Sequence, residues 1–335
     1  MMNDPLKIGI VSFAHMHAWS YLRTLSEIEE GELSAIFEED PERRRALESR
    51  FPDIAIYSDL REMLAREKLD AVIITSENAR HISHAREAML RGLHIMVEKP
   101  ITTRLEDADE ILSLAEREDL IVQTAFPMRY HDATVIVRDL IERGSIGEIL
   151  VITATNHGRY PGGWFGVKEL SGGGAMMDHT VHIADLMRWY TGDEVKKVYA
   201  VRGRNIRENL EVDDIGLISL TFNGGVIGSI DCSWSRPSTY PIWGDVWLLV
   251  IGTKGCIYVD AFASRVESVI EGDRLRWKYS GADADKAMIW DFIRCVEEGR
   301  RPRADGFDGR QALEITLAAY KSVEGGEVVQ LPLGK

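Results

Sequence analysis

The 335-residue chain has few cysteines, and this scarcity excludes several classes of protein. Cys232, Cys256 and Cys295 are far apart, odd in number, and lack the close pairing of a metal site or the even count of a disulfide framework. We therefore expect buried free thiols in a reducing compartment. The chain also lacks an apolar run long enough to cross a bilayer and a signal-peptide pattern at its start. The expected location is the cytoplasm.

Positive charge is in short supply as well. Forty lysines and arginines stand against 54 acidic residues, which gives a net charge of -14. Such a balance argues against nucleic acid or an anionic membrane surface as a partner. The remaining composition, 45% hydrophobic and 28% charged, is ordinary for a globular protein, and the length favours two domains that each bury a core.

The first third of the chain alternates strand and helix patterns. Short apolar runs lie at 7–11, 33–37, 55–57, 71–75, 94–97 and 120–124. Helical patterns separate them, at 17–29, 41–50, 60–67, 81–90 and 105–118. This alternation predicts an α/β domain with a parallel sheet that is covered on both faces.

After about residue 124 the pattern changes to strands that follow one another with short turns. They are predicted at 148–155, 195–202, 215–222, 226–231, 246–251, 256–259 and 274–279, with helices at 133–143, 286–298 and 308–322. Asn223-Gly224-Gly225 is typical of a hairpin turn. We therefore expect domains at 1–124 and 125–335, the second with a mostly antiparallel sheet.

The first strand-to-helix turn lacks the glycines of a dinucleotide-binding loop. Ser12, Ala14 and His17 stand where that pattern needs glycine for a tight turn, close approach of backbone to phosphate, and helix packing. Ser12 and Ala14 are small, so the turn stays feasible, and the Ser12 hydroxyl could donate to a phosphate. Phe13 and His15 lie between these residues. The local sequence by itself neither favours nor excludes nucleotide binding at this turn.

An acidic pair follows the second predicted strand. Glu38 and Glu39 lie about 26 residues beyond the turn, where an acid can accept hydrogen bonds from both ribose hydroxyls of NAD. Asp40-Pro41 also suits the start of a helix, so the run could serve only as a cap. Because the two acids have no basic replacement nearby, we expect NAD rather than NADP.

Glu98-Lys99-Pro100 follows another buried strand. Ligands of open parallel sheets bind beyond the carboxyl ends of strands, so a lysine there is placed to contact a substrate or cofactor. By itself, a Glu-Lys pair at a strand end is more often the start of a solvated loop.

A second polar pair lies on an apolar helix that follows Gly172-Gly173-Gly174. Asp178 and His182 are four residues apart and share a face of that helix. Two interpretations are open: a buried structural pair, or a general base oriented by a carboxylate. His15, His17, His179 and His182 also raise the question of a metal, but their spacing cannot assemble a closed set of ligands, and we expect none.

These motifs together resemble the Gfo/Idh/MocA oxidoreductases over nearly the whole chain. The matching residues are Glu98-Lys99-Pro100, Arg129-Tyr130, Trp164 with Ser171-Gly172-Gly173-Gly174, Asp178 with His182, Gly252-Thr253-Lys254-Gly255, Asp308-Gly309 and Ala312-Leu313-Glu314. The resemblance implies an N-terminal Rossmann domain and a C-terminal α/β domain with a large, open-faced sheet. It also implies Lys99, Asp178 and His182 as catalytic residues, and dimers or tetramers formed through the sheet. The glycine-poor turn departs from the family pattern and puts tight cofactor binding in doubt.

The expected function is NAD-dependent hydride transfer to or from a secondary alcohol of a sugar, polyol or related molecule. The expected cofactor contacts are Ser12, Phe13, Ala14, His15, Glu38, Thr75, Glu98 and Lys99. The expected substrate contacts are Arg129, His157, Arg159, Tyr160, Trp164, Lys168 and His179. Two alternatives stay open: an NAD-dependent glycosidase or lyase that uses transient oxidation, and a non-catalytic NAD-binding sensor. Sequence alone does not identify the substrate, because a fold hosts many of them.

Overall fold

The structure is a computed structural model that describes residues 4–268 and 275–334. The chain forms two compact units. The first unit comprises Met1–Pro127 and Ala284–Arg310, and the second unit comprises Met128–Asp283 and Gln311–Lys335. Within the described ranges, no helix combines the length and the apolar character needed to span a membrane.

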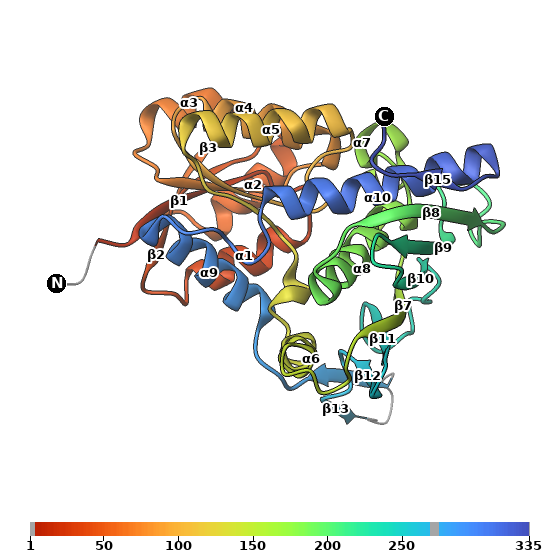
Figure 1. Ribbon diagram of the computed structural model, residues 1–335. Helices are drawn as coiled ribbons and strands as arrows, with labels where there is room; N and C mark the ends of the chain where they lie inside the picture. Colours follow the sequence, from red (N-terminus) through yellow and green to blue (C-terminus); the bar gives the residue numbers. More distant parts are fainter. Residues whose placement is uncertain (1–3, 269–274, 335) are drawn as a thin grey trace. The chain divides into compact units, whose positions relative to one another are not determined.

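A six-stranded parallel sheet forms the centre of the first unit (Figure 1), in the order β3-β2-β1-β4-β5-β6. The strands are β1 (Leu6–Val11), β2 (Gly31–Phe37), β3 (Ala55–Tyr57), β4 (Ala71–Ile74), β5 (His94–Val97) and β6 (Val122–Thr124). This order is that of a Rossmann fold, which confirms the predicted fold class. All four residues of β4 are buried, as expected for a strand covered on both faces.

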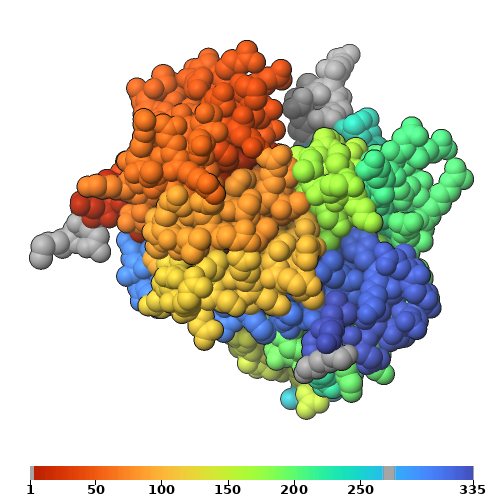
Figure 2. All heavy atoms as spheres, turned by 90° about the horizontal axis from the view of Figure 1, so that it is seen from above, coloured from red at the N-terminus to blue at the C-terminus, as the bar shows by residue number. Residues whose placement is uncertain are grey.

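Helices cover both faces of this sheet. They are α1 (His17–Leu25), α2 (Pro41–Arg50), α3 (Leu60–Arg66), η1 (Asn78–Arg80), α4 (His81–Met89), α5 (Leu105–Glu118) and α9 (Ala284–Glu298). Helices α3, α4 and α5 lie together on one side, and α4 and α5 form a continuous surface in Figure 2. Asp40 caps α2 as predicted, because its carboxylate accepts hydrogen bonds from the backbone N–H groups of Glu42 and Arg43.

Residues 284–310 were expected in the second domain, whereas the structure places them in the first unit. Helix α9 packs against α1, and its Ile293 approaches Gly31 so closely that a methyl group at Gly31 would lie 2.6 Å from the Ile293 Cδ1 atom. The Gln123 side chain on β6 also donates a hydrogen bond to the Met288 carbonyl oxygen (3.0 Å). Only tertiary packing shows that α9 belongs to the first unit, because its sequence pattern is that of any amphipathic helix.

The second unit contains a seven-stranded sheet in the order β12-β11-β7-β10-β9-β8-β15. The strands are β7 (Ile149–Gly158), β8 (Val195–Arg202), β9 (Ile215–Phe222), β10 (Ile227–Ser233), β11 (Gly244–Gly252), β12 (Gly255–Asp260) and β15 (Val329–Gln330). Only β7 and β10 pair in parallel, which confirms the mostly antiparallel prediction. A separate pair joins β13 (Arg265–Ser268) to β14 (Arg276–Tyr279); the predicted strand began at Arg274, which lies outside the described residues.

The second unit also contains helical elements, of which η2 and α10 include residues of the first unit. They are η2 (Pro127–Arg129), α6 (Asp132–Glu142), η3 (Gly163–Gly166), α7 (Lys168–Ser171), α8 (Ala175–Thr191) and α10 (Gly306–Gly325). Helix α8 packs across β7, β9 and β10 (Figure 1). Nearly all its side chains are buried, so it forms part of the core rather than an amphipathic cover.

The opposite face of this sheet carries exposed apolar side chains. Strand alternation directs one set of residues toward α8 and the other set away from it. The exposed members of the second set include Tyr199, Val201, Leu217, Ile227 and Tyr258. Large exposed apolar patches commonly mark contact surfaces between proteins.

Two of the three cysteines are buried as predicted, namely Cys232 and Cys295. Cys256 is exposed on β12, a strand at the edge of the seven-stranded sheet. The expectation of a buried thiol is wrong for Cys256, because only one face of this edge strand packs on the core.

Candidate active site

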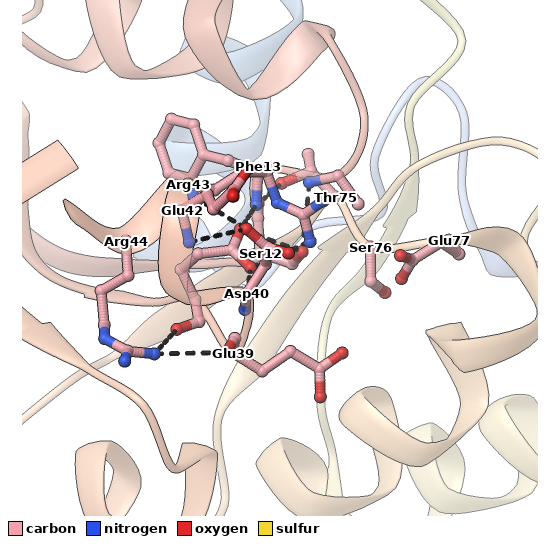
Figure 3. Close-up of polar contacts among 12 residues, drawn as sticks. Ser12, Phe13, Glu39, Asp40, Glu42, Arg43, Arg44, Thr75, Ser76 and Glu77 are labelled. Atoms are coloured by element: carbon pink, nitrogen blue, oxygen red, sulfur yellow. Dashed lines mark hydrogen bonds and ion pairs between the residues drawn. The ribbon is translucent and has the colours of Figure 1, made fainter. Parts of the chain in front are cut away.

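The turn from β1 to α1 has the backbone shape of a glycine loop without the glycines. Ser12 adopts φ 73°, the left-handed conformation that glycine adopts without strain. The Thr75 hydroxyl stabilises the turn by donating a hydrogen bond to the Ser12 carbonyl oxygen (2.6 Å). Figure 3 shows Ser12, Phe13 and Thr75 grouped at this turn. Ser12 therefore replaces the first glycine at a conformational cost of about 1–2 kcal/mol.

The backbone N–H groups of this turn already have acceptors within the first unit. Phe13 N–H donates to the Glu38 carboxylate (2.7 Å), Ala14 N–H to the Ser12 hydroxyl (3.2 Å) and His15 N–H to the Thr75 carbonyl oxygen (2.9 Å). In a dinucleotide-binding loop such groups face the pyrophosphate. A phosphate that accepted hydrogen bonds from these N–H groups would have to replace the internal acceptors.

Glu38 is fully buried at the end of β2, where the sequence predicted a ribose contact. Its Oε2 atom accepts from Phe13 N–H, and its Oε1 atom accepts from Asp40 N–H (2.8 Å) and from the Arg43 guanidinium (3.0 Å). The carboxylate thus has partners on both oxygens. Ribose hydroxyls would have to displace one of them, and Arg43 is the partner that reaches solvent, because its side chain is 36% exposed.

Basic side chains lie beside this acid, contrary to the premise that none is near. Arg43 pairs with the Glu38 side chain, and Arg44 donates to the Glu38 and Glu39 carbonyl oxygens (both 3.2 Å) (Figure 3). Helix α2 brings both arginines back over the end of β2, a proximity that we did not infer from the sequence. The argument from missing basic residues against the 2′-phosphate of NADP is therefore wrong.

Glu98 lies buried at the end of β5 and meets two histidines of the β1–α1 turn. The His17 Nδ1 atom is 2.9 Å and the His15 Nδ1 atom 4.0 Å from the Glu98 Oε1 atom, which also accepts a hydrogen bond from the Tyr21 hydroxyl. Burial raises the pKa of Glu98, but the charges of His15 and His17 outweigh it and hold that pKa well below its usual value. Lys99 is also buried, and its backbone N–H donates to the Glu98 Oε2 atom (3.1 Å).

In the second unit, α8 presents Asp178 to a set of partners that the sequence did not predict. The Trp234 indole N–H donates to the Asp178 Oδ2 atom (2.9 Å), and the His179 Nε2 atom is 3.2 Å from the same oxygen. The His179 Nδ1–H group donates to the Asn156 carbonyl oxygen on β7 (2.9 Å). These contacts fix the carboxylate and the imidazole in a buried environment. His182, one turn further along α8, is 9% exposed.

The start of α8 is held by Asp213, another residue that the sequence did not predict. Its carboxylate accepts from the backbone N–H groups of Gly174 (3.1 Å) and Met176 (2.7 Å) and from the Tyr320 hydroxyl (2.6 Å). A carboxylate is favourable at this positive end of a helix. A methyl group on Gly174 would lie 1.8 Å from the Asp213 carbonyl oxygen, so close approach of backbone requires glycine there. Asp213 lies 39 residues away in sequence, where no local pattern marks it.

Arg129, expected at the substrate, is instead paired inside the second unit. Its guanidinium donates two hydrogen bonds to the Asp185 carboxylate, at 2.7 and 2.6 Å, and both side chains are buried. This bidentate geometry satisfies both charges. The pair favours a structural role for Arg129. It also explains why an acidic residue, Asp185, can be buried on α8.

His157, also expected at the substrate, lies on the other face of the sheet from α8. Side chains alternate along β7, so Asn156 faces α8 while His157 faces away, between Asp231 (3.2 Å) and Asp245 (3.1 Å). Burial lowers the pKa of His157, but hydrogen bonds to both carboxylates outweigh it and raise that pKa to about 9. The expectation that His157 shares a site with Asp178 is wrong, because neighbouring strand residues point to opposite faces.

The other expected substrate residues fall into two groups. Tyr160 packs against Trp234, with ring centroids 5.2 Å apart, and Trp164 stacks on Phe165. Both belong to the aromatic cluster around the indole that binds Asp178. Lys168 is exposed on α7, and the Arg159 guanidinium donates to the Tyr240 carbonyl oxygen.

The fold and these residues define a class of protein. The first unit has the strand order, the turn and the acidic residue of a dinucleotide-binding domain. The second unit adds a buried helix with an acid and histidines, and an open-faced sheet. Together they are typical of a two-domain oxidoreductase that depends on a nicotinamide cofactor.

Comparison with known families identifies the class further. A family profile described as "Oxidoreductase family, NAD-binding Rossmann fold" matches residues 6–126, and one described as "GFO/IDH/MocA C-terminal domain" matches residues 134–258. The chain therefore belongs to the Gfo/Idh/MocA family of oxidoreductases. The resemblance inferred from the sequence motifs is confirmed.

Individual relatives match almost end to end. The myo-inositol 2-dehydrogenase of Thermotoga maritima is 27% identical over 340 residues, which cover 97% of this chain and 98% of the relative. The D-xylose 1-dehydrogenase (NADP(+)) 2 of Haloferax volcanii is 25% identical over 336 residues, covering 97% and 100%. Among solved structures, a probable dehydrogenase from Thermotoga maritima has a TM-score of 0.84 at 27% identity and covers 97% of this chain and 99% of its own.

Proposed function

We propose that this oxidoreductase is an NAD-dependent dehydrogenase of a sugar, a polyol or a related small molecule. The observation that carries the proposal is the end-to-end similarity to dehydrogenases of inositol and xylose, combined with Asp178 and His182 on one buried helix. When bound, the nicotinamide cofactor supplies the hydride chemistry. The protein would supply the binding of the substrate and the transfer of its hydroxyl proton.

Each expected catalytic residue has a separate role in this proposal. His182 takes the proton of the substrate hydroxyl as general base. Asp178, held by the indole of Trp234, provides the negative charge that favours the protonated imidazole. Lys99 donates a hydrogen bond to the same hydroxyl and stabilises the negative charge that develops on its oxygen.

We propose NAD as the preferred cofactor, with NADP the weaker one. Glu38 carries this choice, since a carboxylate at the end of β2 accepts ribose hydroxyls and repels a 2′-phosphate. Arg43 opposes it, because this guanidinium lies 3.0 Å from the carboxylate and could pair with a phosphate. Relatives named with NADP(+) and with NAD(+) indicate that both cofactors occur among proteins similar to this chain.

Calorimetric titration with NAD+ and NADP+ tests the cofactor proposal. We expect tighter binding of NAD+ to the native protein, and Arg43→Ala should strengthen it by removing one of the two hydrogen bonds that the Glu38 Oε1 atom accepts. Equal or tighter binding of NADP+, abolished by Arg43→Ala, would assign the 2′-phosphate to Arg43 instead. The production of NADH with myo-inositol and D-xylose as first probes tests the reaction; hydrolysis or elimination without net NADH would favour the glycosidase or lyase alternative.

We also propose that the chain forms a homodimer or homotetramer through the open face of the seven-stranded sheet. The support is the set of exposed apolar side chains that face away from α8, including Leu217 (50% exposed), Ile227 (54%) and Tyr258 (63%). Light scattering should give at least twice the mass of one chain at micromolar concentration. Leu217→Lys with Tyr258→Lys should produce monomers; a native monomer would contradict the proposal.

A further inference from the structure

Three metal-ligating side chains converge in the first unit. His15 lies in the turn after β1, His17 is the first residue of α1, and Glu98 directly follows β5. One ligand atom of each lies within 4.8 Å of the others, and the imidazole centroids are 4.3 Å apart. From the sequence, these histidines were considered only with His179 and His182, because Glu98 is 81 residues away from His17.

We propose that His15, His17 and Glu98 bind a divalent transition-metal ion such as Zn²⁺. Two imidazoles and a carboxylate are ligands that bind Zn²⁺ and other divalent first-row transition metals. In a tetrahedral site with bonds of about 2.1 Å, ligand atoms lie about 3.4 Å apart. The distances from the Glu98 Oε1 atom, 2.9 Å to His17 and 4.0 Å to His15, lie on either side of that value. Binding through Nδ1 of His15 requires rotation of the side chains toward the ion and loss of the hydrogen bond that this atom accepts from the His17 backbone N–H (3.2 Å).

The surroundings hold the carboxylate in place. The backbone N–H of Lys99 donates to the Glu98 Oε2 atom, and the Tyr21 hydroxyl donates to its Oε1 atom. Hydrogen-bond partners of this kind orient metal ligands. His15 and Glu98 are buried, whereas the His17 side chain is 34% exposed, so an ion can enter from the side of His17.

The proposed site has three protein ligands and one open position. Such a site differs from a closed structural zinc site and can hold water or an oxygen of another ligand. Because the ion replaces the proton between His17 and Glu98, the charge of the site rises by one. An anionic oxygen, such as hydroxide or phosphate, is therefore the favoured fourth ligand.

Metal titration of tag-free protein tests the proposal without any dinucleotide or substrate. The protein is stripped with a chelator and titrated with Co²⁺, whose visible absorption reports the coordination, and with Zn²⁺ by calorimetry. We expect one ion per chain. His15→Asn and His17→Asn should each weaken binding at least about tenfold, a loss that even the outer partners of metal ligands can cause.

His94→Asn is the matched control, since His94 lies at the other end of β5 from Glu98. It should bind the ion like the native protein. Circular dichroism and melting curves establish that each variant is folded. Binding below one equivalent in the native protein, or unchanged binding after His15 and His17 are both replaced, would overturn the proposal.

Discussion

The β1–α1 turn of the first unit and the start of α8 in the second unit both provide acceptors for backbone N–H groups that lead into a helix. They do so with different residues and different backbone conformations. Each is a loop that leads into a helix, and each has a buried carboxylate accepting the loop's backbone N–H groups, Glu38 in one and Asp213 in the other. The turn of the first unit uses Ser12 in a left-handed conformation, whereas α8 is preceded by three glycines. Ser12 adopts the left-handed conformation with its side chain buried near Glu38, whereas glycine is needed at Gly174 because backbone meets backbone there.

The difference predicts different responses to substitution. Around the β1–α1 turn, the polar groups lie in loops and at the carboxyl ends of parallel strands, where ligands of such sheets bind. Around α8, the polar groups are enclosed in the core, where a change in volume or charge affects folding. Substitutions in the turn should therefore alter binding, and those around α8 should alter stability, except at the catalytic residues.

The largest effect is expected at the three catalytic residues. His182→Ala removes the base and should lower kcat on the order of 100- to 10,000-fold. Lys99→Ala should cost about 100-fold or more, and Asp178→Asn should lower the rate and shift its pH profile. The losses should not add, because these residues act as a unit. Kinetics and melting curves on the same samples check this. If folded His182→Ala kept the native turnover, Asp178 and His182 would be a structural pair and not a catalytic one.

A large loss of stability is expected when the buried ion pair between η2 and α8 is broken. Arg129→Met leaves the Asp185 carboxylate buried without its main partner, which should lower the free energy of unfolding by about 3–5 kcal/mol. Arg143→Met breaks an exposed ion pair of similar length and should cost less than about 1 kcal/mol. Urea unfolding measures both. If Arg129 contacted the substrate instead, its replacement would raise KM and leave stability unchanged.

An intermediate effect is expected at the glycine that precedes α8. Gly174→Ala places a methyl group against the Asp213 carbonyl oxygen and should destabilise the protein by about 1–3 kcal/mol or more. Gly203→Ala serves as a control, because a methyl group there meets Ile215 at 3.5 Å, an ordinary contact. Equal melting temperatures for the two variants would show that the backbone at Gly174 can move.

The smallest effect is a dependence of stability on pH. The pKa of His157 is raised from its ordinary value of 6.5 to about 9 by folding, so the folded state holds the proton more tightly than the unfolded chain. Its contribution is fully present below pH 6.5 and is lost as the pH rises through 9. After solvent screening we expect on the order of 1–2 kcal/mol. Urea unfolding across this pH range should show that the free energy of unfolding declines in the native protein and not in His157→Asn. Parallel pH dependences for the two proteins would refute this role of His157.

Local patterns in the sequence determined much of the fold. The alternating runs of the first unit identified each strand of its parallel sheet, because apolar strands and amphipathic helices differ in period and length. The caps and turns, such as Asp40 before α2 and Asn223-Gly224-Gly225 between β9 and β10, followed from residue chemistry that acts over a few positions. The family motifs also identified the class of enzyme, since their order along the chain is itself specific.

Only the tertiary structure decided which groups meet over long separations. In the fold, Trp234 donates a hydrogen bond to Asp178, and Asp213 accepts hydrogen bonds at the start of α8. Arg43 pairs with Glu38, and Glu98 lies beside two histidines. The fold also turned His157 away from α8, since the register and facing of a strand depend on what packs against it. Periodicity along one chain records which face of an element is apolar; the partner of a buried polar group depends on packing between distant segments, which no local pattern encodes.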